Sequence, residues 1–209
     1  MNSLLQRLFA RMYDPCMAAV ERAGLGELRG ALLADLSGEV VEIGAGTGAN
    51  LAHYGAQVRR VVAVEPSLPM ADRLRRRAAD GPDHLDVEVV TAPAERLPLP
   101  DASADVVVST LVLCSVRDVG RTLAEARRVL RPRGRLVLLE HVAGEGRLLR
   151  TQRLLQPVWS PLSGGCHLTR DPAPALATAG FDTAGVDRVE LPMPALTRPG
   201  LVGTAIVPR

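Results

Sequence analysis

The chain has 209 residues, of which 47% are hydrophobic and 23% charged, and its formal net charge is +2. This length fits one domain with a single core, and the composition excludes a disordered chain. The small net charge argues against a dedicated nucleic-acid-binding protein, because such proteins concentrate basic residues on one face.

Cysteine usage and apolar runs bear on where the protein works. Three cysteines, Cys16, Cys114 and Cys166, are an odd number without C-x-x-C spacing, which is typical of reduced thiols. No apolar run reaches the roughly 18 residues that cross a bilayer, and the first residues lack the apolar stretch of a signal peptide. We expect a cytoplasmic monomer or homodimer with no membrane span and no nucleic-acid partner.

Residues 1–34 have apolar side chains at helical spacing. The pattern predicts two helices with a break near Asp14-Pro15. A membrane-surface helix would need more charge, so we favour a helical lid over a bound ligand. Tyr13 lies at the break, where its phenol would either reach the ligand or cap the core.

A glycine-rich turn, Gly44 to Gly48, follows the first predicted strand. The β-branched run Val40 to Ile43 before it, and Ala49-Asn50 after it, predict a buried strand, a tight turn and the start of a helix. Glycines let backbone N–H groups approach a ligand closely, and a helix start favours an anionic group. This turn is therefore the predicted ligand site.

Two acidic residues distinguish this turn from a dinucleotide site. The spacing is E-x-G-x-G-x-G with Glu42 in the strand, whereas dinucleotide enzymes carry G-x-G-x-x-G. A carboxylate at Glu42 would accept hydrogen bonds from an ammonium group, which a pyrophosphate lacks. Glu65 ends the next strand, Arg60 to Val64, where an acidic residue grips the hydroxyls of an adenosine ribose. An ammonium, a carboxylate and a ribose together describe S-adenosylmethionine.

The rest of the chain alternates helices with strands. The predicted helices are Leu68–Asp80 with Ser67 as its cap, Asp118–Leu130, Gly144–Trp159 and Ala173–Ala179. The predicted strands are Leu85–Val90, Asp105–Ser109, Arg135–Glu140, Thr183–Leu191 and Gly200–Val207, with loops at Thr91–Pro98 and Pro161–Asp171. This alternation predicts an α/β fold of three layers, in which helices cover both faces of a mostly parallel sheet of seven strands. The last two strands would form an antiparallel hairpin.

The glycine turn and Glu65 resemble motifs I and II of the class I S-adenosylmethionine-dependent methyltransferases. The resemblance covers nearly the whole chain and implies their Rossmann-like fold, with S-adenosylmethionine as cofactor and S-adenosylhomocysteine as product. It implies one domain, with a lid at 1–34, a cofactor core at 35–143 and acceptor-side elements at 144–209. The residues expected to bind the cofactor are Tyr13, Glu42, Gly44, Ala45, Gly46, Gly48, Asn50, Glu65, Pro66, Met70, Ala94, Glu95, Thr110 and Leu111.

A narrower resemblance is to the alkyl-thiol methyltransferases, the methyltransferase-like 7 family. It rests on G-T-G-A-N at 46–50, T-L-V-L-C-S-V at 110–116, R-V-L-R-P-x-G at 128–134, E-H-V-A at 140–143 and G-C-x-L-T-R at 165–170. The sequence departs from that family in Arg133, where a glycine is usual, and in lacking the amino-terminal membrane anchor. The resemblance implies methyl transfer to a small thiol.

Methyl transfer needs alignment of donor and acceptor in a dry site more than covalent help from the protein. A thiol with a pKa near 8.5 is already partly ionised at neutral pH, whereas an alcohol needs a general base. His141, which ends the fifth strand, and His167, which the resemblance places at the acceptor, are the candidate catalytic residues. Each also has a plainer explanation, a structural histidine for His141 and a surface histidine for His167. We expect no metal, because the histidines and cysteines lack ligand spacing.

Three other functions stay open. The acceptor atom would be oxygen, nitrogen or carbon of a biosynthetic metabolite, or the protein would bind the cofactor without transferring its methyl group. A nicotinamide-dependent enzyme is the remaining alternative, because its turn is also rich in glycine.

Overall fold

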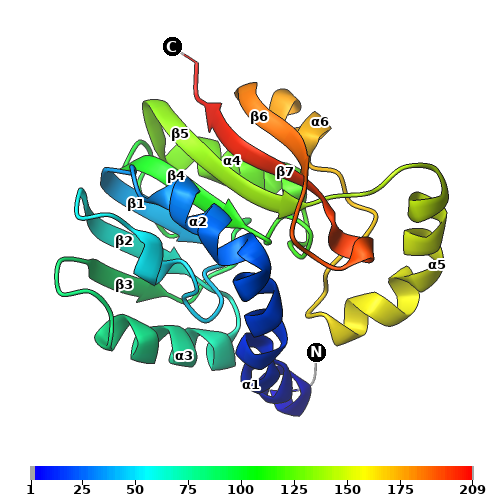
Figure 1. The fold of residues 1–209 in the computed structure, drawn as a ribbon. Coiled ribbons are helices and arrows are strands. Elements are labelled where there is room, and N and C mark those ends of the chain that lie inside the picture. Colours follow the sequence, from blue (N-terminus) through cyan, green and yellow to red (C-terminus); the bar gives the residue numbers. More distant parts are fainter. Residues whose placement is uncertain (1–2, 209) are drawn as a thin grey trace.

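The computed structural model describes residues 3–208 and has one seven-stranded sheet between two layers of helices (Figure 1). The strand order is β3-β2-β1-β4-β5-β7-β6, in which β7 runs antiparallel to β5 and β6 while the other pairs are parallel. The strands are β1 Gly38–Ile43, β2 Val58–Val64, β3 Asp86–Val90, β4 Ala104–Thr110, β5 Leu130–His141, β6 Asp182–Glu190 and β7 Pro199–Ile206. The α-helices are α1 Ser3–Val20, α2 Gly26–Leu33, α3 Leu68–Ala79, α4 Val119–Val129, α5 Gly146–Leu162 and α6 Ala173–Thr178. The predicted fold class is confirmed.

Each face of the sheet packs against its own helices. Side chains of one face share a core with Leu33 of α2 and Leu74 of α3. The opposite face packs against Leu123 of α4 and Leu176 of α6. Because successive residues of a strand point to opposite faces, β-branched runs in β1, β2 and β4 bury both faces at once.

The break in the N-terminal helices lies further along the chain than predicted. α1 continues through Pro15, and the irregular turn is the π-helical segment Glu21–Leu25. Gly24 has a φ of 122°, a conformation that only glycine adopts readily. The glycine, not the proline, therefore sets the angle between α1 and α2.

The helix predicted directly after the glycine turn does not form. The turn is followed by η2, a single 3-10 turn at Leu51–His53, before the chain enters β2. Gly44, Gly46 and Gly48 all have positive φ, so the backbone leaves the helical region up to Gly48 and few residues remain before β2. The predicted electrostatic contribution of a helix start is therefore wrong for this turn.

Three smaller differences concern the ends of elements. β5 begins at Leu130, earlier than predicted, and α5 continues through Pro157 and Pro161. Ser67 is the residue before α3, but its side chain makes no capping bond. Arg133, where the family resemblance leads us to expect glycine, has a φ of 65°, a conformation that glycine adopts more readily.

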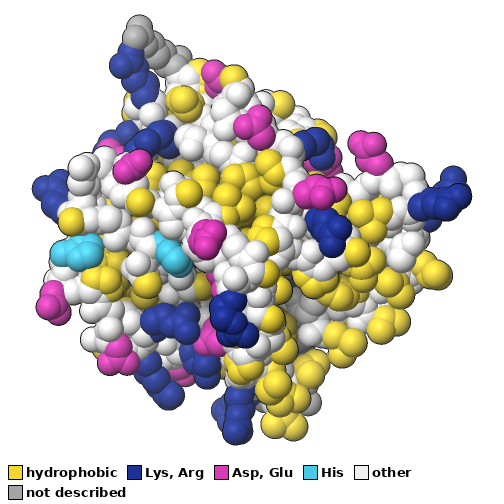
Figure 2. All heavy atoms as spheres, viewed as in Figure 1, with side chains coloured by type: hydrophobic (Ala, Val, Ile, Leu, Met, Phe, Trp, Pro, Cys, Tyr) yellow, Lys and Arg dark blue, Asp and Glu magenta, His cyan; other side chains and the backbone are white. Residues whose placement is uncertain are grey.

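α1 and α5 extend beyond the sheet and expose apolar side chains (Figures 1 and 2). The exposed large apolar residues of these helices are Leu4, Leu5, Leu8, Met12, Leu154, Leu155, Val158 and Leu162. Among the described helices, none combines the length and hydropathy that crossing a bilayer requires.

Candidate functional site

The glycine turn at the end of β1 has the tight backbone that the sequence predicts. A side chain at Gly44 would place its Cβ 2.6 Å from the Val112 methyl groups, and φ there is 58°. At Gly48 a Cβ would lie 2.8 Å from Leu74 Cδ1. The turn therefore needs glycine both for its backbone angles and for its packing under α3.

Glu65 follows β2 and its carboxylate faces the glycine turn. The Gly46 N–H donates to Glu65 Oε2 at 3.0 Å, and the Ser67 N–H donates to Oε1 at 2.8 Å. Burial raises the pKa of Glu65, and these two bonds act against the shift. Each oxygen keeps a second acceptor position, so the carboxylate can also take hydroxyl donors from a ribose.

Glu42 belongs to a buried polar network behind the turn. Its carboxylate accepts from Asn50 Nδ2 at 3.0 Å and from the Tyr54 hydroxyl at 2.7 Å. Arg29 Nη1 donates to Asn50 Oδ1 at 2.7 Å and to Thr110 Oγ1 at 3.0 Å. Burial raises the pKa of Glu42 from 4.5 to about 7, although the Tyr54 bond and the charge of Arg29 oppose the rise. The network joins α2, β1 and β4 at the ligand end of the sheet.

α1 is fastened to the glycine turn and to α3 through Asp14. Thr47 Oγ1 donates to Asp14 Oδ1 at 2.5 Å, and Arg73 and Arg77 pair with Asp14 at 2.8 and 3.2 Å. Burial raises the pKa of the neighbouring Tyr13 to about 12, so its phenol stays protonated at neutral pH.

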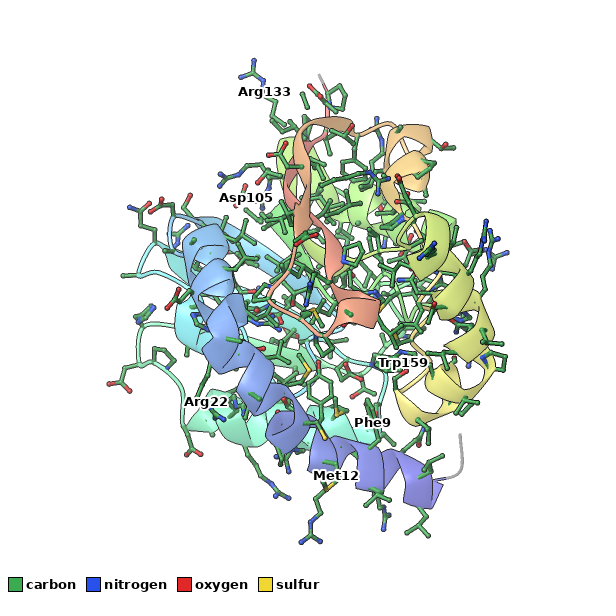
Figure 3. The ribbon with its side chains drawn as sticks, turned by 45° about the vertical axis from the view of Figure 1, so that its right-hand side comes forward. Phe9, Met12, Arg22, Asp105, Arg133 and Trp159 are labelled. Carbon is green, nitrogen blue, oxygen red and sulfur yellow. The ribbon has the colours of Figure 1, made fainter. Side chains whose placement is uncertain are left out.

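α1 also reaches the loop that follows α5. Phe9 and Trp159 point from α1 and α5 toward the space between these helices (Figure 3). A Cβ at Gly164 would lie 2.7 Å from Phe9 Cζ, so the lid packs directly on the loop that follows α5. α1 therefore contacts both the glycine turn and the loop that follows α5.

Two cysteines and a histidine meet at the ends of β4 and β5. His141 Nε2 lies 3.0 Å from Cys166 Sγ, and ligand atoms of Cys114, His141 and Cys166 lie within 4.8 Å of one another. All three residues are buried. Hydrogen bonds from Cys114 and His141 lower the pKa of Cys166, whereas the same thiol pair and burial raise the pKa of Cys114.

His167 lies beside this cluster. Its backbone N–H donates to Cys114 O at 2.8 Å, and its side chain is partly exposed. Burial and the charge of Arg170 lower its pKa, so the imidazole is neutral at pH 7. A neutral imidazole can take a proton.

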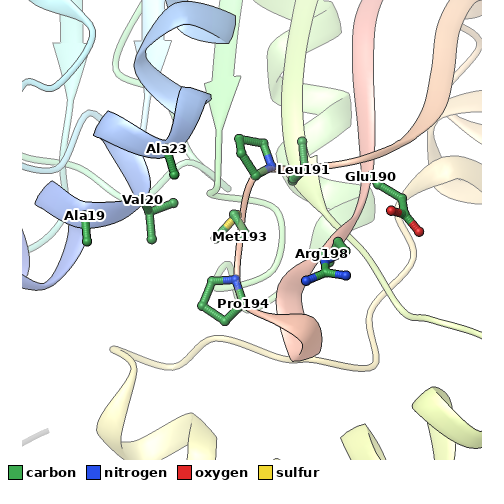
Figure 4. Close-up of a pocket in the computed structure, with 9 residues that line it drawn as sticks. Ala19, Val20, Ala23, Glu190, Leu191, Met193, Pro194 and Arg198 are labelled. Atoms are coloured by element: carbon green, nitrogen blue, oxygen red, sulfur yellow. The ribbon is translucent and has the colours of Figure 1, made fainter.

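A groove of about 590 Å³ opens between the lid and the connection from β6 to β7 (Figure 4). Its walls are largely apolar, with Glu190 and Arg198 on the β6–β7 side. The residues that line it are Ala19, Val20, Ala23, Glu190, Leu191, Pro192, Met193, Pro194 and Arg198. β7 starts beside the end of β5, where Gly200 pairs with His141, so the groove lies at the ligand end of the sheet.

The chain is similar to known methyltransferases over almost its full length. The family model described as "Methyltransferase domain" matches residues 41–138. Thiol S-methyltransferase TMT1A of Homo sapiens is 37% identical over 95% of this chain and 82% of that protein. Thiol S-methyltransferase TMT1B of Homo sapiens is 37% identical over 91% of this chain and 79% of that protein.

The chain belongs to the thiol S-methyltransferase family. This methyltransferase uses S-adenosylmethionine, in agreement with the glycine turn and Glu65. A solved structure from Thermotoga maritima, described as a possible histamine N-methyltransferase, has a TM-score of 0.70 and 24% identity over 97% of this chain and 98% of that one. At this identity the likeness shows a shared fold.

Most residues predicted to bind the cofactor gather around the turn of this methyltransferase. Met70 is buried and its Cε lies 3.8 Å from the Cβ position of Gly46. Ala45 and Leu111 are held by the neighbouring strands, since their N–H groups donate to Val64 O and Leu139 O. Pro66 directly follows Glu65. These contacts position the residues, and their binding of cofactor stays a prediction.

Glu95 and Ala94 lie on the loop after β3, and the Glu95 carboxylate contacts the backbone at the start of α4. Its Oε1 accepts from the backbone N–H groups of Arg117 and Asp118 at 2.6 and 3.3 Å, at the start of α4. The structure therefore gives Glu95 a positioning contact that the sequence did not indicate.

Sequence reasoning missed Arg29, Tyr54 and the meeting of the cysteines with His141. Arg29 carried a signal, because it lies at helical spacing between the apolar residues Leu25 and Leu33 and is therefore a charge on a buried face. The cysteine cluster carried none, because its members come from three separate segments. The lack of metal-ligand spacing along the chain therefore did not exclude that these residues meet in the folded protein.

Proposed function

We propose that this methyltransferase transfers the methyl group of S-adenosylmethionine to the sulfur of a small thiol. Its relatives are named for this reaction, and they match 95% and 91% of the chain. The observation that carries the proposal is the chemistry at the ends of β4 and β5. Two buried thiols and an imidazole meet there.

We propose that the cofactor lies across the ends of β2, β1 and β4. Its ribose would bind Glu65 and its amino-acid end would lie on the Gly44 turn, near Glu42. Neighbouring strands are about 4.8 Å apart, so the end of β5 lies about 14 Å from the end of β2. That distance suits an extended ligand whose methyl group faces His141.

The acceptor would lie between β5 and the loop at residues 163–171. His141 promotes ionisation of the thiol and His167 helps to orient it or takes its proton. Little further help is needed, because a thiol is partly ionised at neutral pH. The lid at 1–34, core at 35–143 and acceptor side at 144–209 would form one domain. Free Cys16, Cys114 and Cys166 agree with a cytoplasmic protein.

The experiment compares matched acceptors that differ only in the nucleophilic atom. The protein is incubated with labelled S-adenosylmethionine and either thiophenol or phenol, and the methylated product is identified by mass spectrometry. We expect transfer to thiophenol alone. Transfer to phenol but to no thiol would reject the proposal.

Two variants test the acceptor side. His141→Asn and His167→Asn should each lower turnover at least tenfold with little change in the affinity for S-adenosylhomocysteine. His84→Asn, at an exposed position before β3, is the matched control. Loss of cofactor affinity with normal turnover would make the two histidines cofactor residues instead.

A further inference from the structure

Three soft metal ligands converge at the acceptor end of the sheet. Cys114 lies just after β4, His141 ends β5, and Cys166 lies in the loop after α5. One ligand atom from each lies within 4.8 Å of the other two, and their relative exposures are 4%, 3% and 8%. Thiolate and imidazole are the donors that zinc prefers in proteins.

Hydrogen bonds between side chains and backbone atoms hold the loop that carries Cys166 against the segment after β4. Arg170 Nη1 donates to Leu113 O at 2.9 Å and to Val116 O at 2.6 Å. Gln156 of α5 donates to Cys166 O at 3.2 Å and accepts from Leu168 N at 2.6 Å. The three side chains are therefore preorganised, and little ordering remains to be supplied on binding.

The distances suit a zinc ion. With Zn–S near 2.3 Å and Zn–N near 2.0 Å, tetrahedral geometry separates sulfur from nitrogen by about 3.6 Å and sulfur from sulfur by about 3.8 Å. The His141 Nε2 to Cys166 Sγ distance of 3.0 Å would need to open only slightly. Two thiolates also balance a divalent charge.

We propose that Cys114, His141 and Cys166 bind a zinc ion whose fourth position takes the sulfur of the acceptor. The inference rests on the proposed function and deepens it by naming what activates the thiol. Three protein ligands with an open position are typical of catalytic zinc sites, whereas structural sites use four.

The chemistry balances without any further reactant. The acceptor thiol binds the zinc through sulfur and loses its proton to His167 or to solvent, because a thiol on zinc is deprotonated. The zinc-bound sulfur attacks the methyl carbon of the sulfonium. The new S–CH3 bond forms as the bond from methyl to the sulfonium sulfur breaks, and that sulfur leaves as the neutral thioether of S-adenosylhomocysteine. The methylated thioether is a weaker ligand than a thiolate and leaves the ion.

Metal content gives the first test. The full chain is produced with a tag that has no histidines in zinc-supplemented medium, and metals are measured by mass spectrometry. We expect about one zinc per chain, retained in Cys16→Ser and lost in Cys114→Ser, Cys166→Ser and His141→Asn. Cys16 is the matched control because it is exposed on α1.

Cobalt gives a measurement that does not depend on variants. Zinc is removed with a chelator and replaced by Co²⁺, which should produce sulfur-to-cobalt absorption bands. Addition of thiophenol should shift these bands and addition of phenol should not. Removal of zinc should lower methyl transfer to thiophenol at least tenfold, with recovery on adding Zn²⁺ and unchanged affinity for S-adenosylhomocysteine.

The possible failures are distinguishable. Methyl transfer to thiols by a protein that binds neither zinc nor cobalt would overturn the zinc site and leave the proposed function intact. So would a Cys114–Cys166 disulfide in the active protein. Zinc that is bound by the three residues, with methyl transfer only to phenol, would refute the thiol acceptor and the role of the fourth position.

Discussion

The proposed cofactor site and the proposed acceptor site lie at different places along one edge of the sheet and are built in different ways. The cofactor end, at β1 and β2, is made from one run of sequence, in which Glu42, the glycine turn and Glu65 lie within 24 residues. The acceptor end, at β4 and β5, is assembled from three distant segments that meet only in the folded chain. A binding turn can therefore be recognised from a short stretch of sequence, whereas an acceptor pocket depends on how β5, α5 and the loop at 163–171 pack.

The largest effect is expected from breaking the network that supports the cofactor end. Arg29→Met removes a buried guanidinium that bonds Asn50 and Thr110 and pairs with Glu21 at 3.1 Å. Removing one member of a buried charged network typically costs about 3–5 kcal/mol, and we expect a loss of this size in the free energy of unfolding. Urea unfolding measures it.

Arg7→Met is the control for Arg29→Met, because Arg7 is exposed on α1. An equally stable Arg29→Met variant would show that the network does not support the turn.

The next effect sharpens the assignment of the cofactor end. Glu65→Ala should weaken the binding of S-adenosylhomocysteine by about 1.5–3 kcal/mol, or roughly 10- to 150-fold, because a charge-assisted bond to the ribose is lost. Calorimetry measures the affinity.

Glu27→Ala is the matched control for Glu65→Ala, because Glu27 is exposed on α2. Unchanged affinity in Glu65→Ala would place the ribose elsewhere.

A third effect is a pH dependence centred on Glu42. Its pKa of about 7 in the folded protein lies above the unfolded value near 4.5, so the folded state holds the proton more tightly. Its contribution to stability is therefore fully present below pH 4.5 and is lost as the pH rises through 7. Thermal unfolding across this range should show that loss in the wild type and not in Glu42→Gln.

The same group tests where the amino-acid end of the cofactor lies. An ammonium beside Glu42 would favour the ionised carboxylate, so binding near pH 7 should release protons. Calorimetry in buffers of different ionisation enthalpy detects this release. If no proton is released, the ammonium does not lie near Glu42.

Patterns in the sequence alone predicted the α/β class, the mostly parallel sheet and the glycine turn with Glu65. These features depend on local periodicity and on backbone angles that only glycine adopts readily, so they can be recognised within short windows.

The remaining features of the fold and of the site depend on contacts between distant parts of the chain. Pro15 did not end α1, because the bend lies at Gly24, and no α-helix follows the turn because the chain enters β2 too soon. Arg29 and Tyr54 reach Glu42, and Cys114 and Cys166 reach His141, through contacts between residues far apart in the chain. The spacing of residues along the chain does not give the distance in space between such segments. The packing of β4, β5 and the loop after α5 alone decides which chemistry the acceptor meets.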